Sequence, residues 1–194
     1  MTFVRLPAHE RREQILAVGV GVFAANGYHS TSMNEVAEAV GVTKPVLYQH
    51  FASKRELYRE LLGEIGAQLR LTIAKATADA DGPRQQIEFG FRAYFEWVEA
   101  HNDSFSVMFG AGTRRDEEFA LEARRVESSV AEVVADLIEI PGISAEQRRL
   151  LANGIVSLAE GSCRYWLLHD VDVDAETLAA QVSQLAWAGL RGIR

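Results

Sequence analysis

Hydrogen-bond donors gather in the stretch between residues 31 and 54. They are hydroxyl, ammonium, amide, phenol and imidazole groups, and they stand at Thr31, Ser32, Thr43, Lys44, Tyr48, Gln49, His50 and Lys54. Groups of these kinds donate hydrogen bonds to phosphate oxygens, and a lysine also donates to O6 and N7 of guanine. The stretch therefore has the chemistry to contact a nucleic acid, if its elements hold these side chains on one surface.

Two short helices separated by Gly41 are predicted to position these donors. The first opens with the run from Ser32 to Glu35, which has the pattern of a capping box. Gly41 supplies the positive φ of a tight turn, and Pro45 falls in the first turn of the second helix, where a missing N–H costs nothing. Two short helices around such a turn are typical of a helix-turn-helix.

The second of these helices is predicted to enter the DNA major groove. Val42, Leu47 and Phe51 can point inward and hold it against the first helix. The side chains left outward or along the rim are those of Thr43, Lys44, Val46, Tyr48, Gln49 and His50. We expect Lys44 to donate to guanine or phosphate, whereas Val46 offers only methyl groups, which contact a thymine methyl or nothing.

A plain pair of antiparallel helices with a solvated polar surface is the competing interpretation. It is the better one for any of these residues taken alone, and only the joint pattern favours DNA binding. The net charge of −7 argues against a chain that coats DNA by bulk attraction. Residues 1–60 nevertheless carry seven Lys and Arg against six Asp and Glu, while the remainder carries 13 against 21. That distribution fits local phosphate contact.

Composition limits the class of protein further. Nearly half of the 194 residues are apolar, so the chain suits one small helical domain and one larger one. The single cysteine, Cys163, excludes an intrachain disulfide and a cysteine-rich zinc site. Neither a signal-peptide segment nor an apolar run of roughly 20 residues is present, so we expect a cytoplasmic protein with no membrane partner.

Periodicity predicts an all-α protein of about nine helices. We expect a three-helix DNA-binding domain over residues 1–54 and a helical ligand-binding and dimerisation bundle over residues 55–194, linked by a long helix from about residue 54 to 76. The remaining helices are expected at residues 9–25, 83–101, 104–109, 116–139, 144–168 and 175–191, with residues 110–115 as a loop.

Aromatic side chains are concentrated in the predicted bundle. The candidates for a ligand site are Phe89, Tyr94, Phe95, Trp97, Phe105, Met108, Phe109, Phe119, Tyr165 and Trp166. At helical spacing each of them alone is more often a core residue. So many in a small bundle, with polar residues nearby, also suit the wall of an apolar cavity for a small-molecule effector.

The last two predicted helices carry apolar and small residues that suit a dimer interface. The candidates are Leu151, Ile155, Leu158, Ser162, Val182, Leu185 and Gly189. Small residues let helices approach closely, so two such pairs can form a four-helix interface. Packing of the same residues within one chain fits the sequence equally well. Two copies would be preferred if the DNA site is itself two-fold, because each half-site then takes one copy.

An enzyme would have to use Cys163, His101, His169 and scattered carboxylates. Cys163 stands among apolar neighbours, and each histidine lies near a predicted helix C-terminus, where a cation is favourable. No phosphate loop, nucleophile elbow or metal-spaced histidine pair is present. We therefore expect no catalytic residue, no metal and no cofactor.

The sequence also resembles the TetR family of bacterial transcriptional regulators. The matching runs are Arg11-Arg-Glu-Gln-Ile-Leu16, Phe23-Ala-Ala-Asn-Gly-Tyr28, Thr31-Ser-Met33, Val36-Ala37 and the whole run from Gly41 to Lys54. The resemblance implies a homodimer on a near-palindromic double-stranded DNA operator, with the last two helices at the interface and a ligand cavity in the body. It implies in most cases a repressor that a small, apolar molecule releases; a ligand-independent regulator and an activator are the alternatives.

The resemblance also implies roles for single residues. Thr31 and Ser32 match phosphate contacts, and His50 and Lys54 match further backbone contacts. The positions that match the recognition helix are Thr43, Lys44, Pro45, Val46 and Tyr48. Many members have glycine and a hydroxyl residue where Pro45 and Val46 stand, so we expect few direct base contacts and a larger role for DNA shape.

Overall fold

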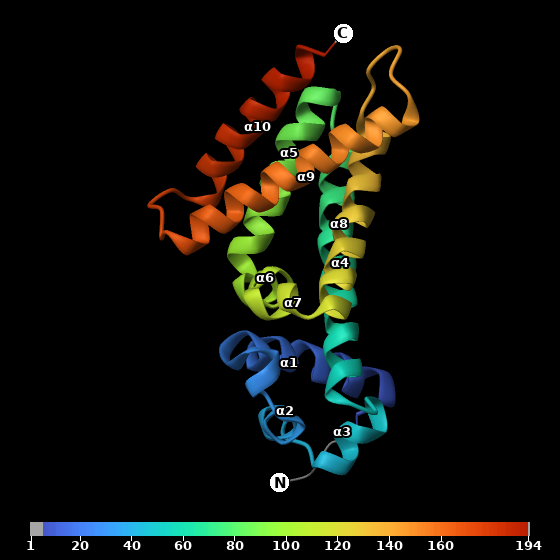
Figure 1. Cartoon of the computed structure of the whole chain (residues 1–194), viewed down its shortest axis with the longest axis vertical. Helices are drawn as coiled ribbons and strands as arrows, with labels where there is room; N and C mark the ends of the chain where they lie inside the picture. Colours follow the sequence, from blue (N-terminus) through green and yellow to red (C-terminus); the bar gives the residue numbers. More distant parts are fainter. Residues whose placement is uncertain (1–5, 194) are drawn as a thin grey trace. The chain divides into compact units, whose positions relative to one another are not determined.

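Residues 6–193 are described by the computed structural model, and within this range the chain is helical without a strand (Figure 1). The prediction of an all-α fold is confirmed. The helices are α1 Ala8–Ser30, α2 Met33–Val40, α3 Lys44–His50, α4 Lys54–Ala78, α5 Pro83–Ala100, α6 Asn102–Phe109, α7 Ala111–Arg115, α8 Glu117–Leu137, α9 Ala145–Leu168 and α10 Ala175–Arg191. The short helix α7 replaces the predicted loop at residues 110–115.

Two compact units make up the described chain. The first contains residues 6–65 and 102–123, and the second contains residues 66–101 and 124–193. The division does not follow the predicted boundary at residue 54, because α6 and α7 pack against α1 and so fold with the N-terminal helices. Helices α4 and α8 each contribute residues to both units. None of the described helices is long and apolar enough to span a membrane.

The first unit holds α2 and α3 against α1 through apolar side chains. Ile15, Leu47 and Phe51 are fully buried, as the helix-turn-helix pattern predicts for the last two. Ser32 Oγ accepts from the Glu35 amide, and the Glu35 carboxylate accepts from the Ser32 amide, so the predicted capping box is present. These bonds lower the pKa of Glu35, the side-chain bond with Ser32 contributing most.

Two glycines with positive φ set the direction of the chain in this unit. Gly27 (φ 75°) interrupts α1 just beyond the predicted helix end at residue 25, although helical geometry resumes as far as Ser30. Gly41 (φ 78°, ψ 32°) ends α2 in the left-handed conformation. Its amide and that of Val42 donate to the last carbonyls of α2, including that of Ala37, which closes the turn before α3.

The second unit is a bundle in which α10 packs along α5 (Figure 1). Its helices begin as the sequence predicts. Pro83 opens α5, Ser144 and Gln147 form a capping box at α9, and Asp174 accepts from the Thr177 amide at α10. Ala131, Ala135, Ile138 and Ala152 form a small-residue core between the end of α8 and the start of α9.

Gly66 allows α4 and α8 to approach closely within the second unit. A Cβ added at Gly66 would lie only 2.8 Å from Cγ1 of Val126, whereas one added at Gly63, one turn earlier in α4, would meet nothing within 4 Å. We predict that Gly66→Ala lowers the free energy of unfolding by roughly 1–3 kcal/mol through overpacking. Gly63→Ala should instead raise it by up to about 1 kcal/mol, through helix propensity. Chemical denaturation of both variants tests this, and equal effects would contradict it.

Candidate nucleic-acid interface and apolar cavity

Helix α3 presents most of the predicted DNA-binding side chains to solvent. Thr43, Lys44, Pro45, Tyr48 and Gln49 are exposed, together with Ser32 at the start of α2, while Val46 and His50 are half-buried. Tyr48 is 43% exposed although it is aromatic. An exposed ring beside an exposed ammonium suits contact with a polyanion better than it suits a core. Eight of the ten predicted side chains therefore have accessible surface around α3 and the α2 cap.

The other two predicted DNA-binding residues, Thr31 and Lys54, bond within the protein. Thr31 is 1% exposed, and its hydroxyl donates to the Gly27 carbonyl at 2.8 Å. The Lys54 ammonium donates to the carbonyls of Tyr28 and Thr31, each at 2.7 Å, and more weakly to that of His29. It also lies 4.5 Å from the centre of the Tyr28 ring. In this arrangement Lys54 caps the end of α1.

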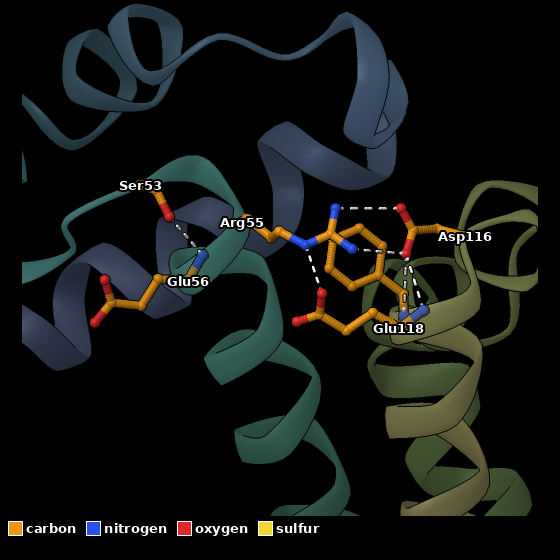
Figure 2. Close-up of polar contacts among 6 residues, drawn as sticks. Ser53, Arg55, Glu56, Asp116 and Glu118 are labelled. Atoms are coloured by element: carbon orange, nitrogen blue, oxygen red, sulfur yellow. Dashed lines mark hydrogen bonds and ion pairs between the residues drawn. The ribbon is translucent and has the colours of Figure 1, made fainter.

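The residue after Lys54 anchors the start of α4 to the start of α8 within the first unit (Figure 2). Arg55 donates to Glu118 at 2.6 Å and to both carboxylate oxygens of Asp116, at 3.2 and 3.4 Å. The bond to Glu118 is the largest cause that raises the pKa of Arg55. Asp116 also accepts from the amides of Glu118 and Phe119, so one carboxylate caps α8 and binds Arg55.

Aromatic rings pack beneath this ion pair. Tyr28, Tyr58 and Phe119 lie with ring centres 4.6–4.9 Å apart, and the Arg55 guanidinium lies 5.0 Å from the centre of the Phe119 ring. The Tyr58 hydroxyl bonds to Thr113 Oγ1 at 2.7 Å and donates to the Val107 carbonyl. Burial raises the pKa of Tyr58. The cluster fixes the end of α1, and it explains why Phe119 is a core residue here.

An apolar cavity of about 310 Å³ lies inside the second unit. Helices α5, α8, α9 and α10 all contribute to it, with one residue from α4. Its lining includes Ile87, Phe91, Tyr94, Val130, Val134, Ile155, Val156, Ala159, Trp187 and Leu190. Polar side chains are few there, chiefly those of Gln86, Glu139, Arg191 and Tyr94. The volume is near the lower end of the roughly 300–1,000 Å³ of small-molecule sites.

Of the ten predicted ligand residues, Tyr94 alone lines this cavity. Phe105, Met108, Phe109 and Phe119 are buried in the first unit, Phe95 and Trp97 are buried in the second, and Phe89 is half-buried there. Tyr165 and Trp166 line a separate groove. Aromatic content alone did not predict the aliphatic side chains that form most of the cavity wall, and it did not predict Trp187. The better signal was the helical stripe of Pro83, Ile87, Gly90, Phe91 and Tyr94, which all face the cavity.

Part of the predicted dimer surface lies in a shallow groove between α9 and α10. Leu158 and Ser162 line it with Tyr165, and Tyr165 and Leu168 are 62% and 72% exposed. Leu185 (62% exposed) and Gly189 are open on α10. The other predicted dimer residues face inward. Leu151 packs on the small-residue core, Ile155 also lines the cavity, and Val182 is buried within the chain.

Cys163 is completely buried on α9. Burial raises the pKa of its thiol to about 12, so the sulfur is protonated at neutral pH and behaves as a small apolar side chain. His101 bonds to the Trp97 carbonyl and stacks on the Trp97 ring at the end of α5. Both placements agree with the structural roles expected from the sequence.

A short, exposed second helix held against a capped first helix is the geometry of a helix-turn-helix, the element with which many transcriptional regulators bind DNA. Comparison with known proteins gives the family. Residues 15–61 match the family described as bacterial regulatory proteins, tetR family, and residues 83–189 match the tetracyclin repressor-like C-terminal domain. The chain belongs to the TetR family, and the resemblance seen in the sequence is confirmed.

Relatives and solved structures agree with this assignment. The chain is 34% identical to the HTH-type transcriptional activator FasR of Mycolicibacterium smegmatis, over 96% of this chain and 85% of that protein. A TetR-like regulator from Rhodococcus sp. RHA1 superimposes with a TM-score of 0.78 at 26% identity, covering 97% and 100% of the two chains. FadR of Bacillus subtilis, solved in complex with stearoyl-CoA, has the same fold, with a TM-score of 0.78 at 17% identity over 94% and 99%.

Lys44 is exposed on α3, whereas Lys54 bonds to carbonyls at the end of α1, so replacing each lysine by methionine tests their different roles. We predict that Lys44→Met weakens DNA binding about tenfold and reduces the slope of log affinity against log salt by about one, with unchanged stability. Lys54→Met should lower the free energy of unfolding by about 1–2 kcal/mol, since it removes charge-assisted bonds to carbonyls. Its salt slope should stay the same.

The two measurements are fluorescence anisotropy over a salt series and chemical denaturation, with a duplex that the protein has selected from random DNA. Lys75→Met serves as a matched control, because it removes the same charge near the end of α4, in the second unit. A stable Lys54→Met variant with a reduced salt slope would show that Lys54 contacts phosphate instead.

Proposed function

We propose that this TetR-family protein is an effector-controlled repressor. In this proposal it binds a near-palindromic operator as a homodimer and leaves the operator when a molecule with a long acyl chain occupies the cavity of each second unit. The observation that carries the proposal is the apolar cavity of about 310 Å³, with its few polar side chains.

The shape and chemistry of the cavity support an acyl chain as the occupant. Its walls are aliphatic and aromatic, so an occupant gains free energy in proportion to the apolar area that leaves water. Six cavity residues lie along α5 from Pro83 to Tyr94, a helical rise of about 16 Å, so the mainly apolar wall is elongated. The stearoyl-CoA complex of a protein with the same fold supports the idea that this fold accepts a long acyl chain.

Two features support operator binding by a dimer. The side chains of Lys44, Tyr48 and Gln49 are exposed on α3, where the family resemblance assigns the recognition helix. Tyr165 lines the groove between α9 and α10, and Leu168 on α9 and Leu185 on α10 are exposed as well, so these helices carry large apolar side chains that a second copy would cover. Thr43, Pro45, Val46, His50 and Ser32 complete the proposed DNA surface.

The proposed mechanism is thermodynamic linkage. Helix α8 contributes Val130 and Val134 to the cavity, and its first turn is bonded to Arg55 at the start of α4. An effector that favours one shape of the bundle therefore also biases the elements that hold the DNA-binding head. Operator half-sites lie one helical turn of DNA apart or a multiple of it, so a small change in the spacing of two heads lowers affinity.

An activator is the second candidate, and one observation favours it. The 34% identical relative is named a transcriptional activator, while a 30% identical relative from Mycobacterium tuberculosis, KstR2, which matches over 48% of this chain, is named a repressor. Both candidates use the same DNA surface and cavity. Transcription in vitro from a promoter that carries the selected operator separates them by the sign of the effect.

Filling the cavity tests the role of the effector. We predict that palmitoyl-CoA, but not free CoA, releases the wild-type protein from its operator. Val156→Phe should raise the concentration needed for release at least tenfold, because a ring replaces a cavity-lining side chain, while operator affinity stays unchanged. Fluorescence anisotropy of the labelled operator measures both quantities.

Leu150→Phe is the matched control for this experiment. Leu150 lies on the same helix, is 73% exposed and does not line the cavity, so its enlargement should leave release by palmitoyl-CoA unchanged. Release that Val156→Phe does not alter would argue against the cavity as the effector site.

A charge placed on α10 tests the dimer. We predict that Leu185→Glu converts the protein to a monomer at micromolar concentration and weakens operator binding at least a hundredfold, because a carboxylate from each copy would be buried in the proposed interface. Leu150→Glu puts the same charge on another exposed leucine, toward the opposite end of α9 from Tyr165 and Leu168, and should leave the dimer intact. Sedimentation velocity reports the oligomeric state, and a dimeric Leu185→Glu protein would contradict the proposed interface.

A further inference from the structure

The hydroxyl of Tyr94 is the most unusual polar group in the second unit. Tyr94 is the last residue of the α5 stripe that lines the cavity, and it is 6% exposed. Its Oη has no hydrogen-bond partner among the described residues. Buried hydroxyls are nearly always paired, so an unpaired one beside a cavity indicates a partner that arrives from outside the chain.

A second unpaired donor occurs next to it on α9. Arg164 donates through Nη2 to Glu160 at 2.6 Å, but its Nε is buried and has no partner among the described residues. Arg164, Glu160 and Cys163 are all close enough to influence the pKa of Tyr94. Ala159, the last cavity-lining residue of α9, immediately precedes Glu160. Arg164 itself does not line the cavity, so Tyr94 is the unpaired group that borders it.

The unpaired Tyr94 hydroxyl and Arg164 Nε are both donors, so a ligand that pairs with them must offer an acceptor atom. Arg164 Nε is a donor only, and the phenol of Tyr94 is a donor whose ionisation is suppressed. Desolvation by burial is the largest cause that raises the pKa of Tyr94 well above its usual value, and Cys163 and Glu160 act in the same direction. A neutral donor in apolar surroundings is best matched by a neutral acceptor such as a carbonyl oxygen.

We propose that the Tyr94 hydroxyl is the specificity determinant of the effector site and donates a hydrogen bond to the carbonyl oxygen of the effector's acyl group. This inference rests on the proposed function, since it requires that an acyl compound occupies the cavity. The acyl chain then extends from Tyr94 along α5 past Phe91 and Ile87 toward Pro83. A plain alkyl chain of equal length can occupy the same apolar cavity but leaves the Tyr94 hydroxyl unpaired. The site therefore prefers acyl compounds to alkyl compounds.

The test combines one protein change with one ligand change. Tyr94→Phe removes only the hydroxyl, and S-hexadecyl-CoA differs from palmitoyl-CoA only in lacking the thioester carbonyl oxygen. Isothermal titration calorimetry of the full-length protein gives the four dissociation constants. We expect Tyr94→Phe to weaken palmitoyl-CoA about tenfold and S-hexadecyl-CoA less than twofold.

Tyr58→Phe is the matched control. Its hydroxyl is also buried but is bonded to Thr113 and Val107 in the first unit. Removing it should lower the melting temperature of the free protein and leave both ligand affinities unchanged. Tyr94→Phe removes an unpaired hydroxyl, so the melting temperature of the free protein should stay the same or rise.

Three results would overturn the inference. One is an equal loss of affinity for the two ligands in Tyr94→Phe, which would mean altered packing; another is no loss for either. The third is a melting temperature that falls as far in Tyr94→Phe as in Tyr58→Phe, since the hydroxyl would then be paired in the free protein. If wild-type protein binds neither ligand, the proposed function fails and this inference fails with it. That result is distinct from the others, in which wild-type binding persists.

Discussion

The end of α1 and the ammonium group of Lys54 form the contact on which the DNA-binding unit depends. A helix that stops leaves carbonyls without amide partners, and here those of Tyr28, His29 and Thr31 accept from one lysine at the start of α4. The chain between these points contains α2 and α3. Lys54 therefore ties the two ends of this segment together, while buried Leu47 and Phe51 hold α3 against α1 and leave its exposed side chains free.

The second unit satisfies a different constraint, because it must stay folded although an apolar cavity interrupts its packing. Packing elsewhere is close: Gly66 brings α4 against Val126, and alanines fill the contact between α8 and α9. Side chains that line a cavity make fewer van der Waals contacts, and so gain less dispersion energy, than side chains in a filled core. The buried, unpaired hydroxyl of Tyr94 adds a further cost in the free protein. Both costs would be relieved by a ligand of the right shape, which is what a binding site requires.

The sequence predicted elements well wherever a local rule decides the outcome. The capping boxes at Ser32 and Ser144, the left-handed turn at Gly41 and the proline start of α5 each depend on one or two residues and their neighbours. The solvent-facing side of α3 was predictable for the same reason, because inward Leu47 and Phe51 leave most of the other side chains outward.

Tertiary contacts decided what the sequence alone left open. Lys54 has the charge of a phosphate contact, and only the folded position of the α1 carbonyls shows another use for it. The aromatic residues of α6 and α8 look like a cavity wall, yet α6 packs on α1 and Phe119 stacks on Tyr28 and Tyr58. Aromatic content cannot distinguish a core from a cavity, because both bury the same surface. The apolar residues at helical spacing on α5, from Pro83 to Tyr94, do indicate the cavity, because they share one face of the helix and line it.

Amide hydrogen exchange measured by NMR, in the free protein and on a DNA duplex that the protein has selected, tests whether Lys54 holds the end of α1 in the absence of DNA. The Thr31 amide bonds to the Gly27 carbonyl in the segment that Lys54 caps, whereas α3 has an open face. If Lys54 holds that segment, the Thr31 amide is strongly protected in the free protein, and DNA adds protection chiefly over Lys44–His50. Rapid exchange at Thr31 in the free protein, with protection that appears only on DNA, would show that Lys54 does not hold this segment and contacts the phosphate backbone instead.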